Sequence, residues 1–165
     1  TGIDTKKVQN IILSLSVQRD EVADLLQRVY NADKYIKFSK TGEKTFTDAS
    51  ESLYADSIRR LREKGFFTYI SGDKFEPYKT VTRGETAKII EDFIVLKTGN
   101  TALRTKFSKD TKSIIRGLDV KDPYYNAVRT AVDAKVMDVS LDGSINPLEP
   151  ISGLETIHTF SKLIK

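Results

Sequence analysis

The chain has 165 residues, of which 39% are hydrophobic and 30% are charged, the ordinary composition of a globular domain that can bury a core. It contains no cysteine, which excludes a disulfide scaffold, a thiolate metal site and a cysteine nucleophile. The sequence has neither a long apolar run nor an N-terminal signal pattern, so we expect no membrane insertion, and the formal net charge of +4 favours an anionic partner.

The first quarter of the chain predicts two helices and a connection. Apolar residues recur every three or four positions in residues 4–15, up to Leu15, and Asp4 is a plausible N-cap. The same spacing returns in residues 19–30 and predicts a second helix. Residues 31–45 have little periodicity and predict a connection.

The middle of the chain predicts two stronger helices. Residues 50–65 have helical apolar spacing that includes Leu53, and Gly65 gives the stop signal. Residues 66–80 predict a turn-rich loop with room for a small hairpin. From Thr82 to about residue 96 the sequence is apolar enough for a central helix, followed by a basic linker over residues 97–110 and a short helix over residues 111–117.

A segment in the second half of the chain repeats the segment that begins at Tyr54. A constant shift of 70 positions aligns Tyr54 with Tyr124 and Glu85 with Glu155, and no gap is needed across about 40 residues. A shift of 64 aligns Val17 with Val81 and Arg19 with Arg83, but the upstream half of the repeat does not follow, since Leu13 stands opposite Pro77. We therefore predict a mainly α-helical domain over residues 1–165, with repeats at about 1–38 (incomplete), 46–97 and 107–165, because repeated units usually bury their apolar faces against one another.

The most regular part of the repeat is a helix start. VTRGET (81–86) and ISGLET (151–156) both have the form of a capping box, in which a hydroxyl and a carboxylate satisfy free N–H groups. Helix initiation alone explains the two hydroxyls and the two glutamates in these segments, which are Thr82, Ser152, Glu85 and Glu155.

Capping does not explain the arginine that follows the cap. Arg83 lies in the first turn, where the helix dipole disfavours a cation, and Arg19 has the matching position in the first copy. Both would suit a docked carboxylate or phosphate, which free N–H groups and a guanidinium bind together. The alternative for Arg19 is a solvated side chain paired with Asp20 or Glu21. The third copy has Gly153 at this position, so we expect its anion site to be lost.

These residues resemble a known family. FTD (46–48), YADSIRRLREKG (54–65), GDKFEP (72–77) and VTRGETAKII (81–90) together resemble the S-layer homology domain. The third repeat resembles it through GLDV (117–120), YYNAV (124–128), LDGSINP (141–147) and ISGLET. The first repeat carries only the second half of the motif, VQRDEVADLLQRV (17–29).

The resemblance implies three helix-loop-helix repeats about a pseudo-threefold helical bundle. It implies an extracellular, non-catalytic module that anchors a bacterial surface or S-layer protein to an anionic, pyruvylated cell-wall polysaccharide, without a cofactor, with other surface-layer segments as further partners. The family's arginine falls on Arg83 and Arg19, beside Thr82 and Gly84 in the helix start. Its helix-one tryptophan falls on Tyr54 and Tyr124, where half-buried packing is the alternative to stacking on a sugar. Asp48 and Asp119 are expected to cap local turns.

Departures from the family motif keep a second function open. Tryptophan is absent, so a module for protein assembly that has lost glycan binding would have a similar sequence. The lone histidine, His158, has no nucleophile motif around it, and LDGSIN (141–146) lacks the spacing of a calcium loop, so we expect neither catalysis nor a metal site. Nucleic-acid binding is disfavoured because the helix after Thr82 is acidic at positions expected to be exposed, namely Glu85, Glu91 and Asp92.

Overall fold

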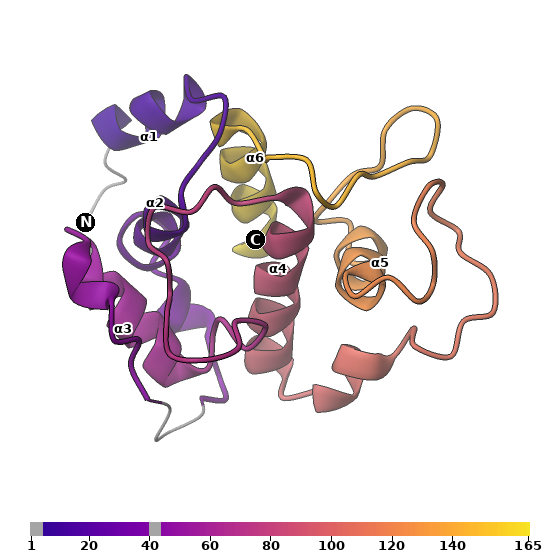
Figure 1. Ribbon diagram of the computed structural model, residues 1–165, viewed down its shortest axis with the longest axis horizontal. Coiled ribbons are helices and arrows are strands. Elements are labelled where there is room, and N and C mark those ends of the chain that lie inside the picture. Colours follow the sequence, from indigo (N-terminus) through magenta and orange to yellow (C-terminus); the bar gives the residue numbers. More distant parts are fainter. Residues whose placement is uncertain (1–4, 40–43) are drawn as a thin grey trace.

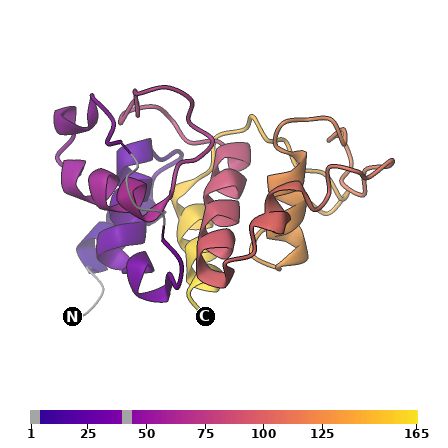
Figure 2. The same ribbon diagram turned by 90° about the horizontal axis from the view of Figure 1, so that it is seen from below.

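The longest helix of the protein lies at the centre of the fold. In the computed structural model, which describes residues 5–39 and 44–165, α4 (Arg83–Thr98) separates the N-terminal helices from α5 (Figure 1). The other α-helices are α1 (Thr5–Ile12), α2 (Arg19–Asp24), α3 (Ala55–Lys64), α5 (Tyr125–Asp133) and α6 (Gly153–Leu163). In both views α6 runs beside α4 (Figure 2). The predicted mainly α-helical class is confirmed.

Short helical turns fill several connections. A π-helical segment, η1 (Leu25–Val29), continues α2 without a break. Three 3₁₀ turns follow in the chain, namely η2 (Ala32–Tyr35), η3 (Ala49–Glu51) and η4 (Thr101–Thr105). Among the described residues no strand occurs, and the extended segments meet only in isolated bridges. The hairpin considered for residues 66–80 is therefore absent.

The sequence of α4 explains its central place. Thr82 caps its first turn through a hydrogen bond from the Glu85 amide, and Gly99 ends it with a positive φ of 72°. Apolar residues occur on several sides of this helix, and Ile89, Ile90 and Phe93 are fully buried. A helix that is apolar on more than one face needs partners on more than one side, which α4 has here.

Aromatic side chains form the core beneath the loop between α3 and α4. Phe67 and Phe75 meet edge to face with ring centres 4.9 Å apart, and Phe46 lies 5.2 Å from Phe75. Phe66 connects this cluster to Phe93 of α4 at 6.3 Å. Because buried aromatic rings contribute heavily to core stability, this cluster anchors the loop between α3 and α4 against α4.

Several predicted boundaries differ from the structure. The helix predicted over residues 4–15 ends at Ile12, so Leu15 lies beyond it and is exposed, while Asp4 lies outside the described residues. Leu53 is not on the buried face of a helix, because α3 starts after it, and the side chain is 97% exposed. Residues 111–117 form bends rather than the predicted short helix. Gly65 ends α3 as predicted, with a φ of 110°.

The acidic residues of α4 are buried, contrary to the sequence-based expectation. Asp92 accepts hydrogen bonds from the Thr68 amide and hydroxyl and from Arg104, and burial raises its pKa against the effect of these bonds. Glu91 accepts a hydrogen bond from Asn126, and burial raises its pKa as well. These carboxylates connect α4 to its neighbours, so they give no argument about an exposed recognition face.

Candidate functional site

The start of α2 is closed by the loop that precedes α4. The amide of Arg19 donates to the Lys79 carbonyl at 3.0 Å, and the amide of Asp20 donates to the Pro77 carbonyl at 2.9 Å. Val81 then donates to the Val17 carbonyl at 2.9 Å. The first free N–H groups of α2 are thus satisfied by this loop rather than left open for an anion. We call this contact the first junction.

The Arg19 guanidinium is hydrogen-bonded within the same junction. Its Nε and Nη2 donate to the Glu85 carboxylate at 2.9 to 3.1 Å, and its Nη1 donates to the Phe75 carbonyl at 2.6 Å. Both members of the ion pair have side chains that are only 7% exposed. Burial alone would lower the pKa of Arg19, but the hydrogen bond and charge of Glu85 raise it, so the guanidinium stays charged. The sequence predicted a docked carboxylate at Arg19. The carboxylate bound there is the side chain of Glu85, which belongs to the protein itself.

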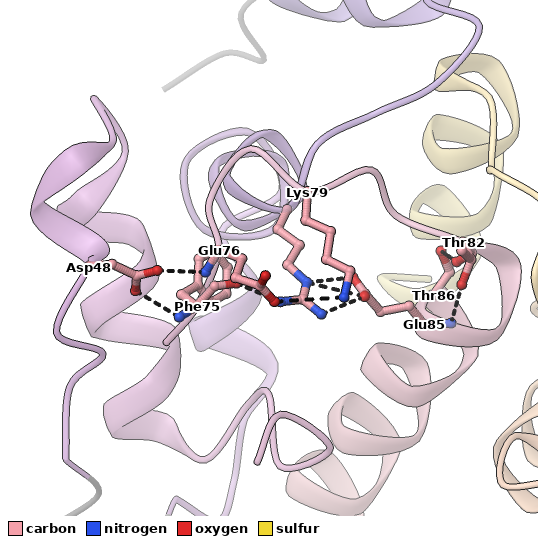
Figure 3. Close-up of polar contacts among 8 residues, drawn as sticks. Asp48, Phe75, Glu76, Lys79, Thr82, Glu85 and Thr86 are labelled. Carbon is pink, nitrogen blue, oxygen red and sulfur yellow. Dashed lines mark hydrogen bonds and ion pairs between the residues drawn. The ribbon is translucent and has the colours of Figure 1, made fainter. Parts of the chain in front are cut away.

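Asp48 fixes the loop that carries these acceptors. Its two carboxylate oxygens accept hydrogen bonds from the amides of Phe75 and Glu76 at 2.7 and 2.8 Å (Figure 3). Glu76 has a positive φ of 54°, a conformation that an ordinary side chain adopts at a cost. Asp48 thus caps a turn that is distant in sequence, whereas Asp119 caps a local turn by accepting from the Lys121 amide.

The start of α4 repeats the arrangement. The amide of Arg83 donates to the Glu149 carbonyl at 2.9 Å, and the amide of Gly84 donates to the Pro147 carbonyl at 2.8 Å. The Arg83 guanidinium pairs with the Glu155 carboxylate at 2.9 Å and with that of Glu149 at 3.2 Å. Here the arginine side chain is 25% exposed, so this second junction opens to solvent where the first is closed.

Tyr124 covers the second junction. A methyl group added at Gly84 would come within 2.8 Å of both the Tyr124 ring and the Pro147 carbonyl oxygen, so only glycine allows this close approach. Burial raises the pKa of the half-buried Tyr124, and the charge of Glu85 adds to the effect. Thr82, Arg83, Gly84 and Tyr124 are therefore gathered in one place.

Tyr54 lies in different surroundings from its counterpart Tyr124. The ammonium group of Lys7 lies 4.1 Å from the centre of the Tyr54 ring and also pairs with Asp24, which is fully buried. The Tyr54 ring also lines a cavity between η1 and α3. The predicted site residues thus fall in two junctions and one cavity rather than in equivalent grooves.

The third junction is closed by backbone contact. The amide of Gly153 donates to the Ser14 carbonyl at 2.9 Å, which places the segment after α1 against the start of α6. The position where a Cβ of residue 153 would lie is 1.5 Å from the Ile11 carbonyl oxygen, so no side chain fits there. The missing arginine is thus matched by the loss of the space that it would need.

Gly153→Ala tests this close approach. We expect it to destabilise the protein by about 1–3 kcal/mol, because the added methyl must push back a backbone carbonyl. Urea denaturation of the variant measures the loss, and Gly143→Ala serves as a control with no atom within 4 Å of the added methyl but a positive φ of its own. A Gly153→Ala protein as stable as the wild type would contradict the contact.

The two predicted capping boxes are half confirmed. The hydroxyls of Thr82 and Ser152 accept from the amides of Glu85 and Glu155 at 3.2 and 3.1 Å. The carboxylates of Glu85 and Glu155 bind Arg19 and Arg83 instead, so they do not close the box. The first copy has no such arginine to bind, and there Glu21 accepts from the Gln18 amide at 2.9 Å as a capping box requires.

These interhelical pairs were not predicted from the sequence. Asp20 or Glu21 was expected as the partner of Arg19, whereas its carboxylate partners are Glu85 at 2.9 Å and Glu76 at 3.5 Å. The sequence did contain a signal for these pairs. The three copies of the helix start contain three glutamates but only two arginines, and the glutamate without an arginine partner, Glu21, closes a capping box instead.

Comparison with known families gives one match, over the middle of the chain. Residues 45–87 match the family model of the S-layer homology domain. The matched segment contains Asp48, α3, the aromatic loop and the start of α4 with Arg83 and Glu85. No curated protein matches the chain.

Proposed function

We propose that the chain binds an anionic secondary cell-wall polysaccharide, because residues 45–87 match the family model of the S-layer homology domain, a cell-wall or cell-surface anchoring module. The bound polymer tethers a bacterial surface protein outside the cell, and its acidic groups are pyruvate ketals. Such domains are generally non-catalytic, and the proposed role is binding without a cofactor.

The observation that carries this proposal is the partial exposure of Arg83. Its guanidinium is held at a helix start by Glu149 and Glu155, and their side chains are 52% and 31% exposed. An arginine has five N–H donors, and a solvent-facing carboxylate such as Glu149 is easily displaced. An incoming glycan carboxylate can therefore take the place of Glu149 without uncovering a buried charge.

The repeated junction contacts support three repeats in one domain over residues 1–165. At the first two junctions, the first two amides of one helix donate to two carbonyls of the next loop, and an arginine binds a glutamate of the next helix. The third junction returns from α6 to the end of α1, so the three contacts close a ring. We propose repeats at about 1–38, 46–97 and 107–165, with the first one shortened.

A specific feature favours protein assembly as a second candidate function. Leu13, Leu15 and Leu154 are exposed close to the third junction, where no arginine is present. Exposed apolar side chains gathered at one place are typical of protein contact. In that alternative the domain holds another segment of the surface layer.

Co-sedimentation with bacterial cell-wall sacculi that retain their secondary polymer tests the anchoring proposal. We expect the wild-type protein to pellet with the sacculi and Arg83→Ala to remain mostly in the supernatant, because the variant lacks the exposed guanidinium. Arg116→Ala is the matched control, since it removes an exposed arginine far from the junctions in the sequence. Thermal melts must show that both variants are folded. A wild-type protein that binds no sacculus would contradict anchoring and favour protein assembly.

A further inference from the structure

The positive charge of the chain is concentrated in a segment at and after the end of α4. Residues 97–116 contain six lysines and arginines and one aspartate, a net charge of +5, whereas the whole chain has +4, so the remaining residues together have −1. The six basic residues are Lys97, Arg104, Lys106, Lys109, Lys112 and Arg116. The excess charge that favours an anionic partner therefore lies outside the junctions at Arg19 and Arg83.

Three exposed cations of this segment have no acidic partner in the part of the chain that the structure describes. Lys109, Lys112 and Arg116 are exposed, and none of them lies within ion-pair distance of a described carboxylate. Asp110, the acidic residue of the segment, accepts a hydrogen bond from the Tyr125 hydroxyl at 3.0 Å. The charges of the three cations are therefore open to a partner from outside the protein.

Exposed apolar side chains lie beside these cations on two neighbouring loops. Ile114 stands between Lys112 and Arg116 in the sequence, and its side chain is 68% exposed. Leu141, in the loop between α5 and α6, is fully exposed. The amide of Arg116 donates to the Gly143 carbonyl at 2.9 Å, so the two loops meet beyond α5 (Figure 1). Ile114 and Leu141 each precede this hydrogen bond by two residues, which places both in one surface.

An open hollow beside the cations has room for a phosphate group. Its volume is about 610 Å³, and its lining includes Thr111, Lys112, Ser113 and Arg116. Hydroxyl groups and cationic N–H groups are donors, and phosphate oxygens are acceptors, so the lining suits a phosphate monoester or diester.

The acidic side chains of the two loops bind groups of the protein itself. Asp119, Asp138 and Asp142 accept hydrogen bonds from the Lys121 amide at 2.8 Å, the Lys162 ammonium group at 3.0 Å and the Ser144 hydroxyl at 2.6 Å, respectively. The hydrogen bond from Ser144 lowers the pKa of Asp142, so this carboxylate is charged at neutral pH. Asp142 thus places a negative charge beside Leu141, which an anionic surface would repel.

From this arrangement we infer that the loop surface formed by Lys109, Lys112, Ile114, Arg116 and Leu141 docks on a lipid bilayer with anionic phosphate headgroups. Lysine and arginine bind the headgroups, while apolar side chains enter the boundary of the acyl chains. A dissolved polyanion would use the cations but leave the apolar side chains in water. The contact is peripheral, because no helix in the described part of the chain has the length and apolar character to cross a membrane. The inference does not depend on the proposed anchoring function and gives the domain a second partner.

Co-sedimentation of the chain with lipid vesicles tests the inference. We expect the wild type to pellet with mixed phosphatidylcholine and phosphatidylglycerol vesicles, and to stay in solution with phosphatidylcholine vesicles, which have no net charge. The double variant Ile114→Ser/Leu141→Ser should bind the mixed vesicles about tenfold more weakly, since it removes the apolar contact. Lys112→Gln/Arg116→Gln should weaken binding about tenfold as well, because it removes two charges.

Matched controls lie elsewhere on the protein. Leu53→Ser removes an apolar side chain that is 97% exposed, and Arg60→Gln removes an arginine that is 51% exposed, so both should bind the vesicles like the wild type. Asp142→Asn keeps an oxygen that can accept from Ser144 but removes the negative charge, so we expect tighter binding. Thermal melts must show that every variant is folded.

Loss of vesicle binding in both double variants, with the two controls unchanged, supports the inference. A wild type that does not pellet with the mixed vesicles would overturn it. Binding that Ile114→Ser/Leu141→Ser retains would also overturn it, because the partner would then be a polyanion held by charge alone. Full displacement by dissolved glycerophosphate would reveal a phosphate site without a bilayer contact and overturn it too. Sacculus binding tests anchoring separately, since purified sacculi contain no bilayer.

Discussion

Arg19→Ala is expected to destabilise the protein by about 3–5 kcal/mol, because it leaves a buried carboxylate without its cation. Glu85 is 5% exposed, and Arg19 supplies the hydrogen bonds found for its carboxylate among the described residues. The Phe75 carbonyl would lose its 2.6 Å hydrogen bond as well. Urea denaturation followed by circular dichroism measures the change in the free energy of unfolding.

A double replacement distinguishes the cost of an unpaired charge from the worth of the pair. Arg19→Met with Glu85→Leu removes both charges and keeps most of the side-chain volume, so we expect it to lose less stability than Arg19→Ala alone. Arg83→Ala should cost only about 1 kcal/mol or less, since the ion pair at the second junction is partly solvated. If Arg19→Ala proved as mild as Arg83→Ala, the first junction would have to be open in solution.

This difference in stability separates the two arginines that the sequence treats as equivalent. Both follow a cap, and both suit an anion at a helix start. The structure gives each one a carboxylate from another helix start, buried for Arg19 and partly exposed for Arg83. An arginine that joins two helix starts through a buried ion pair is a poor ligand site, because releasing it uncovers a buried charge. Binding is therefore expected at Arg83 rather than at Arg19.

Local signals in the sequence predicted local features well. The caps at Thr82 and Ser152 and the stop at Gly65 depend on neighbouring residues, and all three are present. The burial of Glu91 and Asp92 depends on Asn126, Arg104 and Thr68, which approach only when the chain is folded. A sequence pattern cannot separate an acidic residue that faces water from one that binds another helix.

The same reason explains why the junction pairs were missed. Arg19 and Glu85 are 66 positions apart, and Arg83 and Glu155 are 72 apart. The repeat spacing shows which residues are equivalent, but it does not show that the first residue of one helix meets the third residue of the next. The third junction was harder still to foresee, because there Gly153 meets the backbone of Ile11 and Ser14 rather than a loop like those at the other two junctions.

Ile90→Asp is expected to unfold the domain, with a loss of more than about 4 kcal/mol, because Ile90 lies fully buried in α4 and the change places a carboxylate in the apolar core. Ile114→Asp is the control, since that side chain is exposed and the same charge should change stability by less than about 0.5 kcal/mol.

Thermal melting of Ile90→Asp and Ile114→Asp tests whether α4 is the shared centre of the fold. Because α4 contributes to both the first and the second junction, its loss should remove the helical signal of the whole chain in one step. Cooperative melting of Ile90→Asp near the wild-type temperature would show that α4 is not the shared centre of the fold. Melting of only part of the signal would show that the units on either side of α4 fold separately, which a closed ring of junctions does not allow.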